Sequence, residues 1–263
     1  MAQGSQEWQE ETLRVDQTDL QTIKGGTGRP LLVLHDELGH PGWLKWHSAL
    51  ARDHTLIIPL HPGYGRTAAP EWIRSIRDIA GLYSIMVREQ KLAPLDVIGF
   101  SLGGWIAAEM AACNPDQFKR IVLVAASGIK PTEGELRDIF QMMAPDQLRN
   151  SVLDYENTPE FPNLFGGIGP EQFELWEDAR AQTARLAWQP YMHNPSLDHL
   201  LGVVDTPTLL IWGKQDNFVP LNAGEIYQRS MRNARLVTFD QCGHRPEIEK
   251  LPDFLRETQN FLA

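Results

Sequence analysis

The chain has 263 residues, of which 42% are hydrophobic and 22% charged, and its formal net charge at pH 7 is −10. This composition is typical of a globular protein that dissolves in water, and the length suits one α/β domain with an insertion. The negative charge argues against nucleic acid or an anionic membrane surface as a partner. No apolar run in the sequence reaches the length of a membrane span.

The two cysteines, Cys113 and Cys242, do not show the spacing of metal ligands. One disulfide between them is an alternative, but reduced thiols in a cytosolic protein are the better interpretation. The first eleven residues lack the basic and apolar regions of a signal peptide. We therefore expect a cytoplasmic protein that acts on a small molecule without a cofactor. Whether it forms a homodimer is left open.

Apolar runs and helical patterns alternate through the first 126 residues. Two short strands form a hairpin-like start at residues 13–15 and 20–23. Continuous apolar runs, which suit strands covered on both faces, occur at residues 30–35, 55–60, 95–100 and 120–126. Helical patterns lie between them at residues 43–51, 73–90 and 105–112. This order predicts a mostly parallel, doubly wound α/β sheet flanked by helices.

The alternation stops at residue 127 and resumes at about residue 205. The intervening segment has no run typical of a strand, but helical patterns at residues 133–143, 145–153 and 170–188. The α/β pattern then continues with strands at 208–212 and 235–239 and helices from about 221 and from 252 to 261. We predict an α/β core of residues 1–126 and 205–263, and an inserted helical lid of residues 127–204.

The most informative motif is Gly99-Phe100-Ser101-Leu102-Gly103, between a predicted strand and a predicted helix. A turn this tight brings the two backbones so close that a side chain at Gly99 or Gly103 would collide. Ser101 is then held in a strained conformation at the start of the helix, with its hydroxyl lifted clear of the sheet. The free N–H groups and dipole of that helix end favour a developing oxyanion.

A serine nucleophile needs a base, and the base needs an acid that orients it. Asp216 lies four residues after Trp212, just beyond a predicted strand, and His244 follows the last strand. The two are 28 residues apart, which leaves room for one helix and one strand. Each residue alone would be unremarkable in a loop. All three, in this order and at strand ends where open α/β sheets bind ligands, predict a catalytic triad.

These motifs together resemble those of the α/β-hydrolase fold superfamily. The matching segments are Leu34-His35, residues 61–67, the serine turn, residues 212–220 and residues 243–250. The resemblance implies Ser101 as nucleophile, His244 as base and then acid, Asp216 as its orienting partner, and the backbone N–H of Leu102 as one oxyanion donor. It does not specify the substrate, because the superfamily hosts many chemistries.

The loop that should supply the second oxyanion donor departs from the family pattern. It reads His35-Asp36-Glu37, with Asp36 where a glycine is usual, and the resemblance implies the backbone N–H of Glu37 as the donor. An acidic side chain here would oppose the oxyanion unless it points to solvent or pairs with a cation. A metal site of His35, Asp36 and His40 is a minor alternative, and we expect no metal.

Large apolar residues of the predicted lid suggest what the site binds. Most of them should pack the lid on the core, but some must line the pocket above Ser101. The candidates for substrate binding are Phe140, Met143, Phe165 and Trp188. Their character predicts an apolar or aromatic acyl or alcohol group.

Three functions fit these observations. The first is a serine esterase that cleaves a carboxylic ester through an acyl-enzyme. The second is a hydrolase of carbon–carbon bonds like the meta-cleavage product hydrolases, which the segment from Ser101 to Trp105 resembles. The third is a ligand-binding receptor on a hydrolase scaffold, which has less need of all three triad residues. A nucleophilic serine argues against haloalkane dehalogenases and epoxide hydrolases, whose nucleophile is Asp.

Overall fold

The structure, a computed structural model, describes residues 7–167 and 169–263. Within these residues one eight-stranded sheet has the order β1-β2-β4-β3-β5-β6-β7-β8. Its strands are β1 (Trp8–Val15), β2 (Thr18–Gly26), β3 (Arg29–Leu34), β4 (His54–Pro59), β5 (Leu95–Phe100), β6 (Phe118–Val124), β7 (Thr208–Gly213) and β8 (Ala234–Phe239). β1 and β2 form an antiparallel hairpin, β2 pairs antiparallel with β4, and every other pair is parallel. The prediction of a mostly parallel α/β sheet is confirmed.

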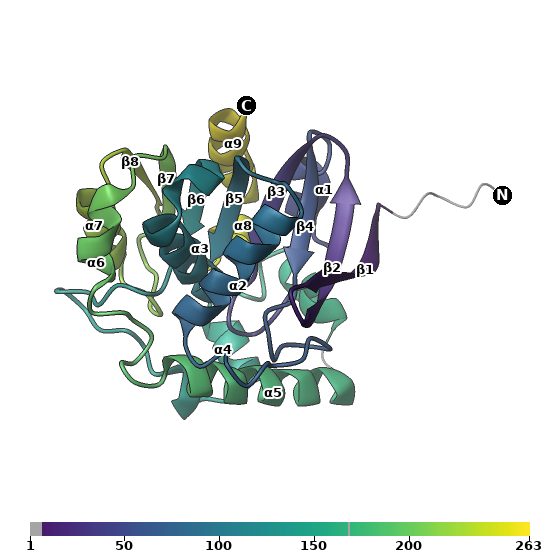
Figure 1. The fold of residues 1–263 in the computed structure, drawn as a ribbon. Helices are drawn as coiled ribbons and strands as arrows, with labels where there is room; N and C mark the ends of the chain where they lie inside the picture. Colours follow the sequence, from purple (N-terminus) through teal and green to yellow (C-terminus); the bar gives the residue numbers. More distant parts are fainter. Residues whose placement is uncertain (1–6, 168) are drawn as a thin grey trace.

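Helices cover both faces of the sheet (Figure 1). On one face α2 (Ile76–Glu89), α3 (Leu102–Cys113) and α7 (Leu221–Ser230) contribute to one hydrophobic core, which includes Leu32 and Leu34 of β3. On the other, α1 (Lys45–Leu50), α8 (Pro246–Glu249) and α9 (Leu251–Leu262) contribute to a second core, which includes the alternate residues Leu31 and Val33 of β3. Because side chains alternate along a strand, continuous apolar runs such as residues 31–34 supply both layers of core.

The segment between β6 and β7 crosses the end of the sheet. It holds the helices α4 (Ala144–Asn150), α5 (Pro170–Ala187) and α6 (Leu197–Leu200) and the 3-10 turns Ile139–Gln141, Phe161–Gly166 and Leu201–Val203. Figure 1 shows α4 and α5 beside the carboxyl ends of the parallel strands. The prediction of a helix over residues 133–143 was wrong. Gly134 has a positive φ of 78°, and the Asp138 side chain accepts a hydrogen bond from the N–H of Phe140, so only one 3-10 turn forms.

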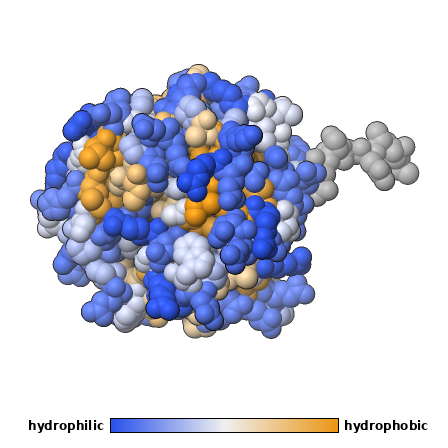
Figure 2. Space-filling model, viewed as in Figure 1, coloured by the Kyte–Doolittle hydropathy of each residue, from blue (hydrophilic) through white to orange (hydrophobic). Residues whose placement is uncertain are grey.

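The surface seen in Figure 2 is mostly hydrophilic, with hydrophobic residues gathered in a few patches. None of the helices in the described part of the chain is both long and apolar enough to span a bilayer. Cys113 is exposed and Cys242 is buried, and both thiols are free. The first strand begins at Trp8, earlier than the hairpin predicted from the sequence.

Candidate active site

Ser101 lies in the sharp turn between β5 and α3. Its backbone has φ 45° and ψ −111°, a strained conformation for a residue other than glycine. A Cβ atom at Gly99 would lie 2.4 Å from the carbonyl oxygen of Gly103, and one at Gly103 would lie 2.2 Å from that of Leu34. The two glycines therefore permit the contact between strand and helix that holds Ser101 in place, as the motif predicts.

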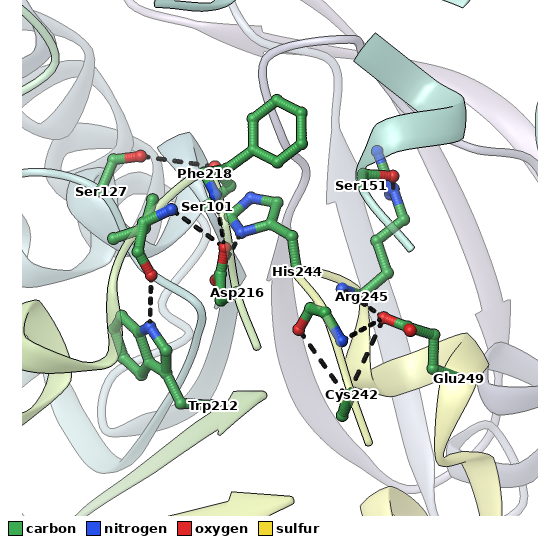
Figure 3. Close-up of polar contacts among 12 residues, drawn as sticks. Ser101, Ser127, Ser151, Trp212, Asp216, Phe218, Cys242, His244, Arg245 and Glu249 are labelled. Atoms are coloured by element: carbon green, nitrogen blue, oxygen red, sulfur yellow. Dashed lines mark hydrogen bonds and ion pairs between the residues drawn. The ribbon is translucent and has the colours of Figure 1, made fainter. Parts of the chain in front are cut away.

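Asp216 and His244 form a closely hydrogen-bonded pair. Asp216 Oδ2 lies 2.7 Å from His244 Nδ1, and Asp216 Oδ1 accepts hydrogen bonds from the N–H groups of Phe218 (2.8 Å) and Val219 (3.0 Å). Because a carboxylate accepts, His244 carries its proton on Nδ1 and leaves Nε2 free to act as a base. Figure 3 shows the His244 ring next to both Ser101 and Asp216.

The environment of His244 favours its protonated form. Burial lowers its pKa, but the charge and hydrogen bond of Asp216, with a contribution from Glu37, outweigh burial and raise the pKa above the ordinary value of 6.5. A base with a raised pKa takes a proton from a serine more readily, provided that the pH keeps it neutral beforehand.

Ser101 and His244 line one narrow cavity of about 10 Å³. Its wall is largely apolar, and on the polar side the Ser127 hydroxyl lies 3.4 Å from Ser101 Oγ. The other lining residues are Glu37, Leu136, Arg137, Ile139, Met192, Phe218 and Val219. The lining of this narrow cavity is suited to apolar groups next to a buried nucleophile.

The four lid residues predicted to bind substrate do not line this cavity. Met143 and Trp188 are 58% and 54% exposed. Phe140 packs on Trp188 and Tyr191, and Phe165 packs edge-on against Trp176. The same segment instead contributes Leu136, Ile139 and Met192 to the cavity. Apolar character alone could not single them out, because an irregular segment has no periodicity that shows which side chains face inward.

The departure from the family pattern at Asp36 is compensated by a buried cation. Asp36 Oδ2 lies 2.5 Å from Nη2 of Arg245, and Asp36 Oδ1 accepts a 2.9 Å hydrogen bond from the N–H of Leu38. Asp36 and Arg245 are 5% and 4% exposed. The Asp36 carboxylate is thus paired with a cation. As expected from the sequence, such a pairing keeps its charge from opposing an oxyanion.

Two neutral histidines support the same loop. His35 accepts a hydrogen bond from the N–H of His61 at Nε2 (3.0 Å), so its Nδ1–H donates to the carbonyl oxygen of Asp36 (2.7 Å). Burial lowers the pKa of His35 to about 4, although Asp36 partly opposes this. Both ring nitrogens of His35 are occupied by these contacts, which hold the loop rather than a metal ion.

Glu37 contributes more to the site than its predicted backbone donor. Its side chain lines the cavity with Ser101, and Oε1 accepts a 2.8 Å hydrogen bond from Nε2 of Gln147 in α4. On the other side of the turn, Leu102 is the first residue of α3, so its N–H has no partner within the helix. Sequence reasoning left the role of the Glu37 side chain open and missed Gln147, because nothing in the sequence brings residue 147 beside residue 37.

Known proteins similar to this chain are consistent with this geometry. The model of the alpha/beta hydrolase family matches residues 31–257. The chain is 27% identical to a 2-hydroxymuconate semialdehyde hydrolase of Pseudomonas sp. (strain CF600), over 90% of this chain and 88% of the relative. It is 26% identical to a pimeloyl-[acyl-carrier protein] methyl ester esterase of Neisseria meningitidis serogroup B, over 65% of this chain and 69% of the relative.

The fold is also found among solved structures. The 2-hydroxy-6-oxo-6-phenylhexa-2,4-dienoate hydrolase from Rhodococcus sp. strain RHA1 superimposes with a TM-score of 0.77. That comparison covers 97% of this chain and 99% of the other at 18% identity, which shows a common fold.

Proposed function

Because the chain is a hydrolase that belongs to the α/β-hydrolase family, we propose that it cleaves a carboxylic ester of a small, largely apolar substrate through Ser101, His244 and Asp216. The observation that carries the proposal is the fixed His244–Asp216 pair beside Ser101 in a cavity with a largely apolar wall. An ester needs no more than these groups and two oxyanion donors for its hydrolysis.

The reaction follows from the placement of the protons. His244 Nε2 takes the proton of Ser101 Oγ, which attacks the carbonyl carbon and forms a tetrahedral intermediate. The N–H groups of Leu102 and Glu37 donate to its oxyanion. When the intermediate collapses, the alcohol leaves with the proton from His244. Water, deprotonated by the same imidazole, then attacks the acyl-enzyme, and the carboxylic acid is released with Ser101 restored.

The relatives leave two bond types to compare. One relative is named as a methyl ester esterase and another as a 2-hydroxymuconate semialdehyde hydrolase, and a similar solved structure is named as a meta-cleavage product hydrolase. Purified protein should therefore be given p-nitrophenyl acetate, butyrate and octanoate in parallel with a ring-fission dienone. We expect turnover of the shorter esters. A dienone kcat/KM well above that of every ester would identify carbon–carbon cleavage instead.

The variant Ser101→Ala tests the nucleophile in the same assays. Loss of the attacking oxygen should lower kcat by about 10⁴-fold or more. Ser196→Ala, an exposed serine of the lid, is the matched control and should leave turnover unchanged. Equal activity of Ser101→Ala and the wild type would contradict the assignment, and binding without turnover of any substrate would favour a receptor.

A further inference from the structure

The Glu37 carboxyl is a buried acid with one unused oxygen in the reaction cavity. The residue is 4% exposed, and Oε1 is held by Nε2 of Gln147. Oε2 is buried and has no hydrogen-bond partner within residues 7–167 and 169–263. Buried carboxyl oxygens nearly always have a partner, so a free one beside Ser101 indicates that a bound molecule completes its contacts.

The partner of Oε1 determines where a proton on this carboxyl would lie. An amide N–H donates, so Oε1 is the accepting oxygen and the hydroxyl of a protonated Glu37 is at Oε2. The neighbours of the Glu37 carboxyl include the backbone N–H of Glu37 itself and the hydroxyl of Ser101. Glu37 also lines the cavity together with Ser101 and His244, so its carboxyl lies beside the space that the substrate carbonyl has to enter.

Within residues 7–167 and 169–263, Glu37 forms no ion pair, although Arg137 lines the same cavity. Arg245, the buried cation nearby, is already paired with Asp36 and with Glu247, whose Oε1 lies 3.6 Å from Nη1. Arg137 lies over the Phe218 ring, 5.5 Å from its centre. The remaining titratable groups that face the Glu37 carboxyl are Asp36, His244, Tyr64 and Tyr191.

These surroundings favour the neutral acid. Burial and the charge of Asp36 raise the pKa of Glu37, and His244 and the hydrogen-bond donors offset only part of that rise. A carboxylate in this place would also repel the oxyanion that forms on the neighbouring carbonyl. A neutral carboxyl would instead donate a hydrogen bond to it in a buried site, where such donors have their largest effect.

We propose that Glu37 is a further catalytic residue, a neutral carboxylic acid whose Oε2–H donates a hydrogen bond to the carbonyl oxygen of the substrate, oriented by Gln147 of the lid. The proposal rests on the serine-hydrolase function above.

The proposal predicts a bell-shaped dependence of kcat/KM on pH. The rate rises with pH as His244 loses its proton, and it falls at higher pH as Glu37 loses its own. Because the two groups interact, the two limbs give apparent pKa values of the pair. In E37Q, whose amide can donate from the same place but does not titrate, the falling limb disappears.

The experiment compares the wild type with E37Q and E37M on p-nitrophenyl acetate across the pH range of the stable protein. E37M has no donor and should lower kcat by about 10²-fold, the loss typical of one oxyanion donor, whereas E37Q should lower it less. E174Q, the same substitution on the exposed side of α5, should reproduce the wild-type profile. A falling limb that persists in E37Q, or equal kcat values for E37Q and E37M, would overturn the proposal.

Two further measurements separate this proposal from the ester assignment. Phosphonylation of Ser101 by a neutral fluorophosphonate needs the triad and the oxyanion hole but no ester turnover. The dependence of its rate on pH should have the same two limbs in the wild type and only the rising limb in E37Q. The infrared difference spectrum of wild type minus E37Q at neutral pH should contain the C=O band of a protonated carboxyl. If phosphonylation shows both pH limbs but no ester is hydrolysed, the ester assignment is wrong and the role proposed for Glu37 stands. A carboxylate band, or a wild-type preference for cationic esters that E37Q loses, would reject the neutral acid.

Discussion

At the scale of single residues, the site depends on neighbours of the reacting groups as much as on the groups themselves. Asp36 precedes Glu37 and Arg245 follows His244, and these two neighbours form a buried ion pair. The pair joins the loop after β3, which holds Glu37, to the loop after β8, which holds His244. Arg245 Nε also donates to the Ser151 hydroxyl of the lid at 2.8 Å, so three segments meet at one guanidinium.

Removing one charge of this pair should destabilise the protein strongly. Asp36→Asn leaves Arg245 buried without its main partner, and we expect the free energy of unfolding to fall by about 3–5 kcal/mol, measured by urea denaturation. The double variant Asp36→Leu, Arg245→Met removes both charges and should recover much of that loss. Asp205→Asn breaks an exposed pair with Arg232, 70% and 64% exposed, and should change stability by less than about 1 kcal/mol. Equal effects of Asp36→Asn and Asp205→Asn would contradict the structural role.

The acid of the triad has its own test. Asp216→Asn keeps the shape but favours the wrong tautomer of His244, and kcat should fall by about 10⁴-fold. Neither Asn217→Ala nor Asp205→Ala alters the contact between Asp216 and His244, and both variants should keep kcat near the wild-type value. If Asp216→Asn is as active as these two, His244 must be oriented by another acid.

Residues in local motifs were predictable from the sequence, and residues in long-range contacts were not. Ser101, Asp216 and His244 each follow a strand, and the parallel order of strands brings strand ends together. The side chain of Glu37 is determined by Gln147, 110 residues away in the lid, and Asp36 by Arg245, 209 residues away. No periodicity or spacing shows such pairs, so the sequence indicated only that the loop was unusual.

At the scale of elements, the turn between β5 and α3 is the most constrained connection of the fold. Gly103→Ala would place a methyl group 2.2 Å from a backbone oxygen of β3, which cannot move without distorting the sheet. We expect a loss of more than about 4 kcal/mol in stability, or no folded protein. Gly81→Ala in α2, where a Cβ meets nothing within 4 Å, should stabilise the protein by about 0.5–1 kcal/mol. Thermal unfolding of both variants checks the contrast, which would be absent if the turn could relax.

Element boundaries followed the sequence pattern where the pattern was regular. The predicted helix of residues 170–188 is α5, Pro170–Ala187, and the strands of residues 95–100 and 208–212 are β5 and β7 within one residue. The prediction failed at residues 133–143, where backbone groups form hydrogen bonds with a distant side chain instead of within a helix. The N–H of Ile139 donates to the Tyr191 hydroxyl, which donates in turn to the carbonyl oxygen of Arg137. Such tertiary contacts override a helical pattern of apolar residues.

At the scale of the whole molecule, the segment from residue 127 to 204 is attached to the core through the site itself. The Tyr64 hydroxyl lies 2.6 Å from the Thr183 hydroxyl, and Gln182 donates to the carbonyl oxygen of Pro62. The N–H of His244 donates to the carbonyl oxygen of Ser151. Leu136, Ile139 and Met192 of this segment line the cavity with Ser101, so in the proposed esterase they would limit the space for the acyl group.

That arrangement predicts how the lid sets acyl-chain length. Met192 is 5% exposed and lines the cavity, so Met192→Ala should enlarge it and raise kcat/KM for octanoate relative to acetate by about tenfold or more. Met143→Ala makes the same change at a residue that is 58% exposed and outside the cavity, and should leave the ratio unaltered. Because truncation of a buried methionine costs about 2–5 kcal/mol of stability, both variants should be assayed well below their unfolding temperatures. A ratio of rates is insensitive to the fraction of folded enzyme, since both esters are hydrolysed by the same molecules. An equal ratio in the two variants would place the acyl group elsewhere, and a rise in Met143→Ala alone would point to the outer surface of the lid.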